Sequence, residues 1–234
     1  NERFEPQVTT GQYNEERNCI ADEIFWAATE LYLTTGNDKY LEDAKRNMPE
    51  SFELPTWGSI AGLGSYEWMA QSLRSNSAVA QEMAKALCPS MIAQLDERLA
   101  LVPGSCFQSP FGNLETDFGW GCNGEFCAGQ GVALLMAYYL TGDKRYLTGA
   151  LEDVNYIFGQ NATGYCYLTG FGTKQVMHPH QRISSADGIE APLPGFLAGG
   201  PNRGRQDGLT NYPSDLPDES YLDEEPSYAS NEIA

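Results

Sequence analysis

Two stretches of the sequence, LYLTTGNDKYL at residues 31–41 and AYYLTGDKRYL at residues 137–147, decide the predicted fold. They align without a gap, and each places a Thr-Gly pair between an apolar segment and a Tyr-Leu pair. A glycine followed by Asn or Asp ends one helix and starts the next, so each stretch predicts a helical hairpin. Coincidence in two alanine-rich helices is the alternative. Because the motif occurs twice, we predict an array of hairpins, either an open solenoid or a closed toroid, and favour the toroid.

Apolar residues recur at helical spacing through the first two thirds of the chain. Within residues 21–34, for example, Ile24, Ala28 and Leu31 fall on one helix face. The predicted helices span residues 21–34, 39–46, 60–74, 77–101, 125–140 and 144–158. Pro89 predicts a kink in the longest of them, because proline cannot donate the helical hydrogen bond. We therefore predict an all-α fold.

From Gly159 onward the composition changes to Gly, Pro, Asn, Asp, Ser and Tyr without helical periodicity. Long polar loops on one rim of a helical scaffold usually carry its site. The chain also opens without Met and ends in what reads as the first turns of a helix, so we expect a piece of a longer chain. We predict one incomplete domain over residues 1–234, with hairpins over about 20–158 and active-site loops over about 159–234.

The charge of the chain limits its partners. Fourteen Lys and Arg against 32 Asp and Glu give a net charge of −18. Nucleic acid and anionic membrane surfaces both need a basic patch, so we exclude both as partners. No segment reaches the ~20 apolar residues that cross a bilayer. The six cysteines form no C-x-x-C pair and lie away from both histidines, which argues against a zinc finger; whether they are buried or bridged stays open.

The segment from Tyr165 to Arg182 concentrates groups that can bind sugars. His178, His180 and Arg182 lie within five residues of one another, among several tyrosines. Imidazole and guanidinium groups can hold sugar hydroxyls or orient a carboxylate, and tyrosine rings offer stacking faces. The alternative is that both histidines only satisfy loop carbonyls.

Acidic and tyrosine residues gather again at the end of the chain. Asp223 and Glu232 flank Tyr228 in this segment. A carboxyl group in a tyrosine-lined pocket, close to another acid, keeps its proton more strongly and can serve as a general acid. Asp223 and Glu232 could form such a coupled pair. The alternative is a solvated acidic surface, which the overall charge makes common.

Two tryptophans, Trp57 and Trp120, lie in glycine-rich surroundings. An indole ring can stack on the apolar face of a pyranose, so both are candidate glycan platforms. Tryptophan more commonly anchors a core, and that reading stays open for each.

Several segments together resemble a known family. The run from Thr169 to Arg182 resembles the first active-site signature of glycoside hydrolase family 9, and the run from Tyr221 to Glu232 resembles its second. The intervening residues 192–195 and 199–202 and the upstream residues 21–26 also fit. The resemblance covers nearly the whole chain. It implies cellulases built as an (α/α)6 toroid of helical hairpins, with long loops on one rim, so we expect this chain to be part of such a toroid.

The resemblance implies roles for the candidate residues. Glu232 matches the catalytic acid that protonates the departing glycosidic oxygen, and Asp223 matches a supporting acid. His180 and Arg182 match residues that contact the sugar beside the cleavage point. A further set matches aromatic positions lining the cleft: Tyr228, Trp120 and Trp57. Asp187 and Glu190 fall where some members bind calcium, which implies a structural calcium ion, whereas the chemistry requires no cofactor.

The chain departs from the family pattern in the catalytic base. Family members invert the anomeric carbon with a second carboxylate, an aspartate of an Asp-Ala-Gly-Asp motif, and residues 1–234 contain no such motif. We therefore expect a C-terminal part of the domain, inactive alone, whose partners are a β-glucan and the missing N-terminal half.

The expected activity is hydrolysis of β-1,4-glucosidic bonds in cellulose or a related β-glucan by a secreted enzyme, because so large a polymer cannot enter a cell. The alternatives are a non-catalytic glycan-binding scaffold and a glycosidase for another glycan, such as xyloglucan, mixed-linkage glucan or chitosan-like oligomers.

Overall fold

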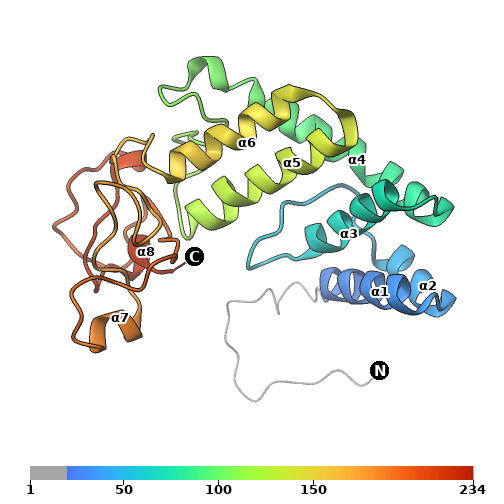
Figure 1. The fold of residues 1–234 in the computed structure, drawn as a ribbon, viewed down its shortest axis with the longest axis horizontal. Coiled ribbons are helices and arrows are strands. Elements are labelled where there is room, and N and C mark those ends of the chain that lie inside the picture. Colours follow the sequence, from blue (N-terminus) through green and yellow to red (C-terminus); the bar gives the residue numbers. More distant parts are fainter. Residues whose placement is uncertain (1–19, 234) are drawn as a thin grey trace. The chain divides into compact units, whose positions relative to one another are not determined.

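The computed structural model describes residues 20–233, and its regular elements are helices (Figure 1). Four helices come first: α1 (Ala21–Thr35), α2 (Asp38–Asn47), α3 (Ala61–Arg74) and α4 (Ala78–Leu99). A 3-10 turn, η2 (Val102–Gly104), and a π-helix, η3 (Asn123–Ala128), then lead into α5 (Gly129–Thr141) and α6 (Lys144–Ile157). Three short elements lie in the later loops: α7 (Arg182–Ala186), η4 (Pro217–Glu219) and α8 (Tyr228–Asn231). Within residues 20–233 only isolated β-bridges occur, so the all-α prediction is confirmed.

Both predicted hairpin joints are present and are built alike. Gly36 and Gly142 have φ angles of 69° and 72°, a left-handed conformation that favours glycine, and each donates its N–H to the carbonyl four residues earlier. The next residues, Asn37 and Asp143, then cap α2 and α6 by accepting the N–H two residues later. α1 packs against α2, and α5 packs against α6, as two helical hairpins.

The chain divides into two units, residues 1–88 and 89–234, and the boundary falls at Pro89 within α4. In the first unit α1 packs against both α2 and α3. Trp68 of α3 is fully buried there, and its indole Nε1 donates to Thr29 Oγ1 of α1 at 2.8 Å. Because this bond satisfies the only polar group of the ring, Trp68 can anchor the α1–α3 contact.

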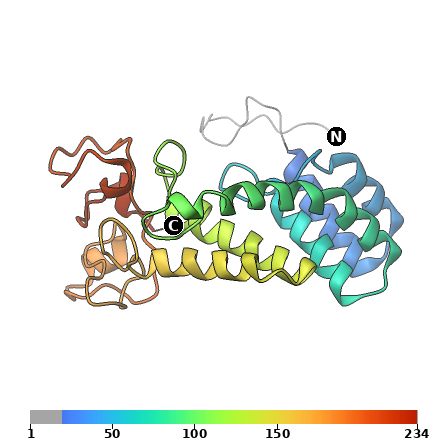
Figure 2. The same ribbon diagram turned by 90° about the horizontal axis from the view of Figure 1, so that it is seen from above.

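In the second unit, α5 and α6 run side by side, and the loops that carry the signatures follow the end of α6 (Figure 2). A buried aromatic cluster lies among these elements: Phe111, Phe118, Tyr156, Tyr167 and Tyr221. The ring of Tyr221, in the second signature, and that of Tyr167, two residues before the first, have their centroids 5.0 Å apart. The core therefore ties both signature loops to the helical scaffold.

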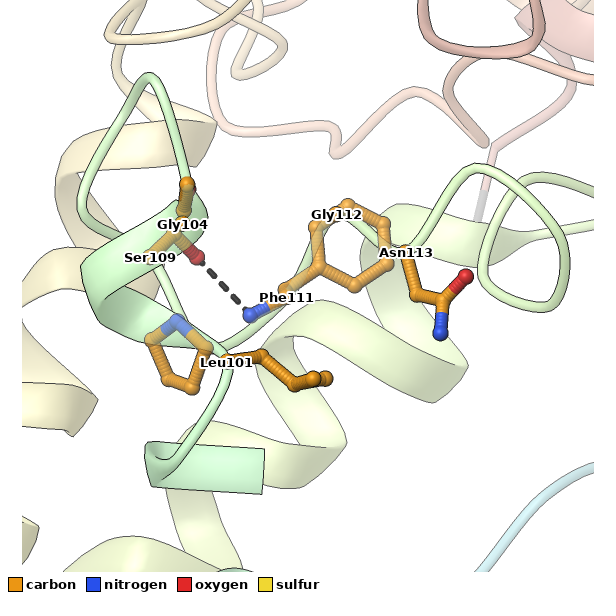
Figure 3. Close-up of a pocket in the computed structure, with 8 residues that line it drawn as sticks. Leu101, Gly104, Ser109, Phe111, Gly112 and Asn113 are labelled. Carbon is orange, nitrogen blue, oxygen red and sulfur yellow. Dashed lines mark hydrogen bonds between the residues drawn. The ribbon is translucent and has the colours of Figure 1, made fainter. Parts of the chain in front are cut away.

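A buried polar network stabilises the same unit. Arg98 of α4 binds the Asp117 carboxylate through two nitrogens and donates from Nε to Gln130 Oε1 at 2.6 Å. Gln130 donates to Asp153, which also accepts the hydroxyl of Ser109 at 2.8 Å. Ser109 also lines a cavity of about 260 Å³. Figure 3 shows the residues around this cavity, where the hydroxyl oxygen of Ser109 accepts the N–H of Phe111.

The structure also bears on the cysteines, whose state the sequence left open. All five cysteines in the described range are free thiols, and Cys19 lies outside it. Burial raises the pKa of the Cys122 thiol to about 12, so this group is an unreactive core residue.

Residues 20–233 also contain no helix with the length and apolar character that crossing a membrane requires.

Candidate active site

The two signature loops meet along the backbone. His180 donates its main-chain N–H to the carbonyl of Asn231 at 2.8 Å, and His180 and Glu232 form a parallel β-bridge. On its other side, Glu232 accepts the N–H of Gly199 at 2.7 Å, and Ile233 forms an antiparallel bridge with Ala198. The backbone of Glu232 is therefore fixed between two loops.

Asp223 holds the histidine loop. Its carboxylate accepts the main-chain N–H groups of Met177 and His178, each at 2.9 Å. The amide of Asn231 donates to the same carboxylate at 3.3 Å. The hydrogen bonds described for this carboxylate thus come from Met177, His178 and Asn231, and a coupled pair of Asp223 and Glu232 stays a prediction. The carboxylate fixes the loop that leads into His180.

Asn231 is a site residue that the sequence reasoning missed. Its side chain is fully buried and donates to the carbonyl of His178 at 2.6 Å, while its Oδ1 accepts the hydroxyl of Tyr221. One amide thus satisfies groups from both signature loops, which a buried donor and acceptor require. The signal that the sequence offered for this role was the position of Asn231, directly before Glu232.

The Glu232 side chain is exposed. We expected a tyrosine-lined pocket that would favour the protonated form by burial, and residues 20–233 do not enclose the carboxyl group in this way. A pocket around Glu232 therefore stays a prediction for the complete domain. What they do supply is a rigid backbone beneath a carboxyl group that a ligand can reach.

Three of the predicted binding residues lie together. The rings of Trp120 and Tyr228 stack with centroids 6.0 Å apart and planes at 16°, and the His180 ring lies 6.0 Å from Tyr228. Both larger rings are partly exposed, at 39% and 40%, so they offer a face to a ligand. His180 Nδ1 lies 2.7 Å from the carbonyl oxygen of Glu225. This carbonyl can only accept, so Nδ1 carries a proton, and a neutral ring has Nε2 free to accept from a sugar hydroxyl.

A second carboxylate supports α8, the short helix between Asp223 and Glu232. Asp207 accepts the hydroxyl of Tyr212 at 2.6 Å and that of Ser227 at 3.1 Å, and Ser227 precedes α8 directly. Partial burial by itself would raise the pKa of Asp207, but these hydrogen bonds outweigh it and hold the pKa below its usual value. The ionised carboxylate therefore secures the start of the helix that carries Tyr228.

The other two predicted binding residues, Arg182 and Trp57, have exposed side chains. Arg182 is exposed at the start of α7. Trp57 is 60% exposed in a turn of the first unit. Its role in a cleft stays a prediction.

The predicted calcium residues do not form a preformed cage. Asp187 and Glu190 are both exposed, and Asp187 Oδ1 accepts the N–H of Ile189 at 2.8 Å. Calcium takes six to eight oxygens. Within residues 20–233 no group of three or more His, Cys, Asp or Glu side chains could hold a metal ion. The structural calcium therefore stays a prediction, and no chemical step is assigned to it.

The chain is similar to several known proteins. The family profile described as Glycosyl hydrolase family 9 matches residues 1–234. The chain is 45% identical over 234 residues to the xyloglucan-specific endo-β-1,4-glucanase BoGH9A of Bacteroides ovatus, covering all of this chain and 39% of that protein. It is 31% identical to the cellulose 1,4-beta-cellobiosidase of Acetivibrio thermocellus, covering 95% of this chain and 27% of that protein.

Solved structures give the same result for the fold. The chain matches a structure described as Bacteroides ovatus GH9 with a TM-score of 0.85 and 42% identity, over 99% of this chain and 40% of the other. It matches AaCel9A, solved in complex with a cellobiose-like isofagomine, with a TM-score of 0.76 and 30% identity, over 92% of this chain and 40% of the other. The chain thus spans about two fifths or less of each of these four matches. It belongs to glycosyl hydrolase family 9 and forms part of the (α/α)6 fold of that family.

Proposed function

We propose that the protein containing this chain hydrolyses β-1,4-glucosidic bonds in cellulose or a related β-glucan, with inversion at the anomeric carbon. The observation that carries the proposal is the bridged backbone of Glu232, which is fixed between the His180 loop and Gly199 while its carboxyl group stays exposed. The named relatives support the substrate, since one acts on xyloglucan and one on cellulose, both of which have a β-1,4-glucan backbone.

In this proposal Glu232 is the general acid. It gives its proton to the glycosidic oxygen as the bond to the anomeric carbon breaks, so that the leaving sugar departs as a neutral alcohol. A second carboxylate on the opposite face takes a proton from water, which attacks the same carbon. Inverting enzymes hold the two carboxyl groups roughly 6.5–9.5 Å apart to leave room for that water. This base lies outside residues 1–234, because the chain has no Asp-Ala-Gly-Asp motif.

The remaining site residues position the sugar. The stacked rings of Trp120 and Tyr228 match the apolar faces of glucose units, and His180 Nε2 can accept a hydroxyl hydrogen bond. Arg182 can donate to further hydroxyl groups from the start of α7. Asp223 acts indirectly, by holding the main chain that ends in His180.

The proposal extends to the rest of the protein. Residues 1–234 alone carry one of the two catalytic carboxylates, so the isolated chain is inactive until the N-terminal part of the domain completes it. A polymeric substrate places the enzyme outside the cell. A structural calcium at Asp187 and Glu190 would only brace the loop after α7.

The test is the stereochemistry of hydrolysis by the full-length protein. Proton NMR of fresh digests of cellotetraose and of a xyloglucan oligosaccharide should show the α-anomer first, with the β-anomer growing only by mutarotation. Initial β-anomer would contradict inversion. Binding of both ligands without any turnover would support the non-catalytic scaffold instead.

A further inference from the structure

Asn123 lies more than 100 residues before Glu232 in the sequence but contacts the segment that pairs with it. Its side chain is fully buried, and Nδ2 donates to the carbonyl of Ala198 at 3.0 Å. Its main-chain N–H donates to the carbonyl of Gly199 at 2.9 Å. The N–H of Gly199 in turn donates to the carbonyl of Glu232 at 2.7 Å. A continuous chain of hydrogen bonds thus runs from Asn123 to the backbone of the predicted acid.

Glycine at position 200 makes this contact sterically specific. A Cβ at Gly200 would lie 2.5 Å from Cγ, Oδ1 and Nδ2 of Asn123, and the φ angle of 97° also disfavours any side chain. The N–H of Gly200 donates to the carbonyl of Ser230 at 2.9 Å. Residues 198–200 are therefore held against Asn123 on one side and against residues 230–233 on the other.

Asn123 also begins the π-helix η3, three residues after the Trp120 platform. Single π-helical turns are rare and often mark functional sites. Here Asn123 donates two hydrogen bonds, which fix the first turn of η3 to residues 198–199. These bonds also fix the position of the backbone that follows Trp120. The same residue thus connects the segment of Trp120 with the segment that pairs with Glu232.

We propose that Asn123 is a positioning residue, which acts through Ala198–Gly200 to hold the Glu232 carboxyl group at the glycosidic oxygen. The inference rests on the proposed function, because it takes Glu232 as the proton donor. Asn123 does not touch substrate in this account. A displacement of about 1 Å at a reacting group can cost ~10²-fold in rate, so loosening the backbone of Glu232 should slow proton transfer.

The dependence of kcat on the leaving group distinguishes a loss of proton transfer from a general loss of activity. Cellotetraose has a poor leaving group that needs an acid, whereas 2,4-dinitrophenyl cellobioside releases a stable phenolate without protonation. In the full-length protein, Asn123→Ala should lower kcat for cellotetraose by about tenfold or more and change it for the dinitrophenyl substrate by less than about twofold. Glu232→Gln is the benchmark and should show the same pattern more strongly.

Asn161→Ala is the matched control. Asn161 is another buried asparagine, and its amide donates to the carbonyls of Tyr156 and Tyr165 rather than to residues 198–200. It should lower the thermal unfolding midpoint while leaving the ratio of the two kcat values unchanged. Gly200→Ala is the second variant, in case Asn123→Ala does not fold, and it should reproduce the leaving-group pattern by pushing on the same side chain.

The outcomes distinguish the two proposals. The leaving-group pattern in both Glu232→Gln and Asn123→Ala supports the inference. The pattern in Glu232→Gln, with equal losses on both substrates or none in Asn123→Ala and Gly200→Ala, overturns the inference and leaves the proposed function standing. Full activity of Glu232→Gln on both substrates overturns the proposed function and the inference together.

Discussion

The carboxylate of Asp223 accepts the main-chain N–H of His178 at 2.9 Å, across 45 residues of sequence. Its second oxygen accepts the N–H of Met177, so the acid of one signature binds the backbone of the other. A carboxylate that accepts hydrogen bonds from two N–H groups is held in one orientation, because each oxygen must face its donor. Asp223 therefore holds the histidine loop through its main-chain N–H groups.

We expect Asp223→Asn to lower kcat of the full-length protein on cellotetraose by about 10- to 100-fold. Asparagine has only one acceptor oxygen, so its NH₂ group would face one of the two N–H donors and displace the loop. The fall in rate at alkaline pH should remain, because that limb of the pH profile reports the loss of the proton from the acid, Glu232. Loss of the alkaline limb in Asp223→Asn would make Asp223 the proton donor and contradict this assignment.

The Arg98–Asp117 pair should stabilise the unit that carries the site. The side chains are 25% and 5% exposed, and the Arg98 guanidinium also binds Gln130. Arg98→Ala would strand a buried carboxylate, so we expect a loss of about 3 kcal/mol in the free energy of unfolding, measured with denaturant on the full-length protein. The control is Arg145→Ala, which breaks exposed ion pairs with Asp143 and Asp96 and should change stability little. Equal effects of the two variants would show that the buried pair has no special role.

Asp153 should make stability depend on pH. Burial raises the pKa of this carboxyl group from 3.8 to about 7, although hydrogen bonds from Gln130 and Ser109 partly oppose the rise. The folded protein therefore holds a proton between pH 4 and 7 that the unfolded chain has released. The resulting stability is present at low pH and is lost as the pH rises through about 7.

Asp153→Asn imitates the neutral carboxyl group and should remove this dependence. We expect its thermal unfolding midpoint to exceed that of the wild type by about 5 °C at pH 8, with little difference at pH 4. Calorimetry of the full-length protein at both pH values measures this. A gap that is the same at both pH values would mean that Asp153 does not titrate in this range.

The hairpin joints could be predicted from sequence because their determinants are local. The glycine cap at Gly36 or Gly142 and the Asx cap that follows need only adjacent residues. The start of α5 was less predictable. The sequence pattern predicts a helix from residue 125, whereas the structure has a π-helix from Asn123, whose N–H is bound to Gly199. Such a turn depends on a contact far along the chain.

Part of the candidate site could be predicted from the sequence, but the hydrogen bonds of its residues could not. His180, Tyr228 and Trp120 gather as expected, because the signature loops that carry them meet. The roles of Asp223 and Asn231 depend on which carbonyl and N–H groups the folded loops leave unsatisfied, and composition does not record that. The exposure of Glu232 could not be read from neighbouring tyrosines, because burial depends on which elements surround a residue in the fold.

The central claim is that Glu232 donates the proton to the leaving sugar, and its most direct test is the initial rate of cellotetraose hydrolysis by the full-length protein. Glu232→Gln removes the titratable group at nearly constant shape, and the exposed Glu115→Gln is its matched control. The account predicts a loss of at least about 10²-fold for the first variant and an unchanged rate for the second. A wild-type rate in Glu232→Gln would contradict the account.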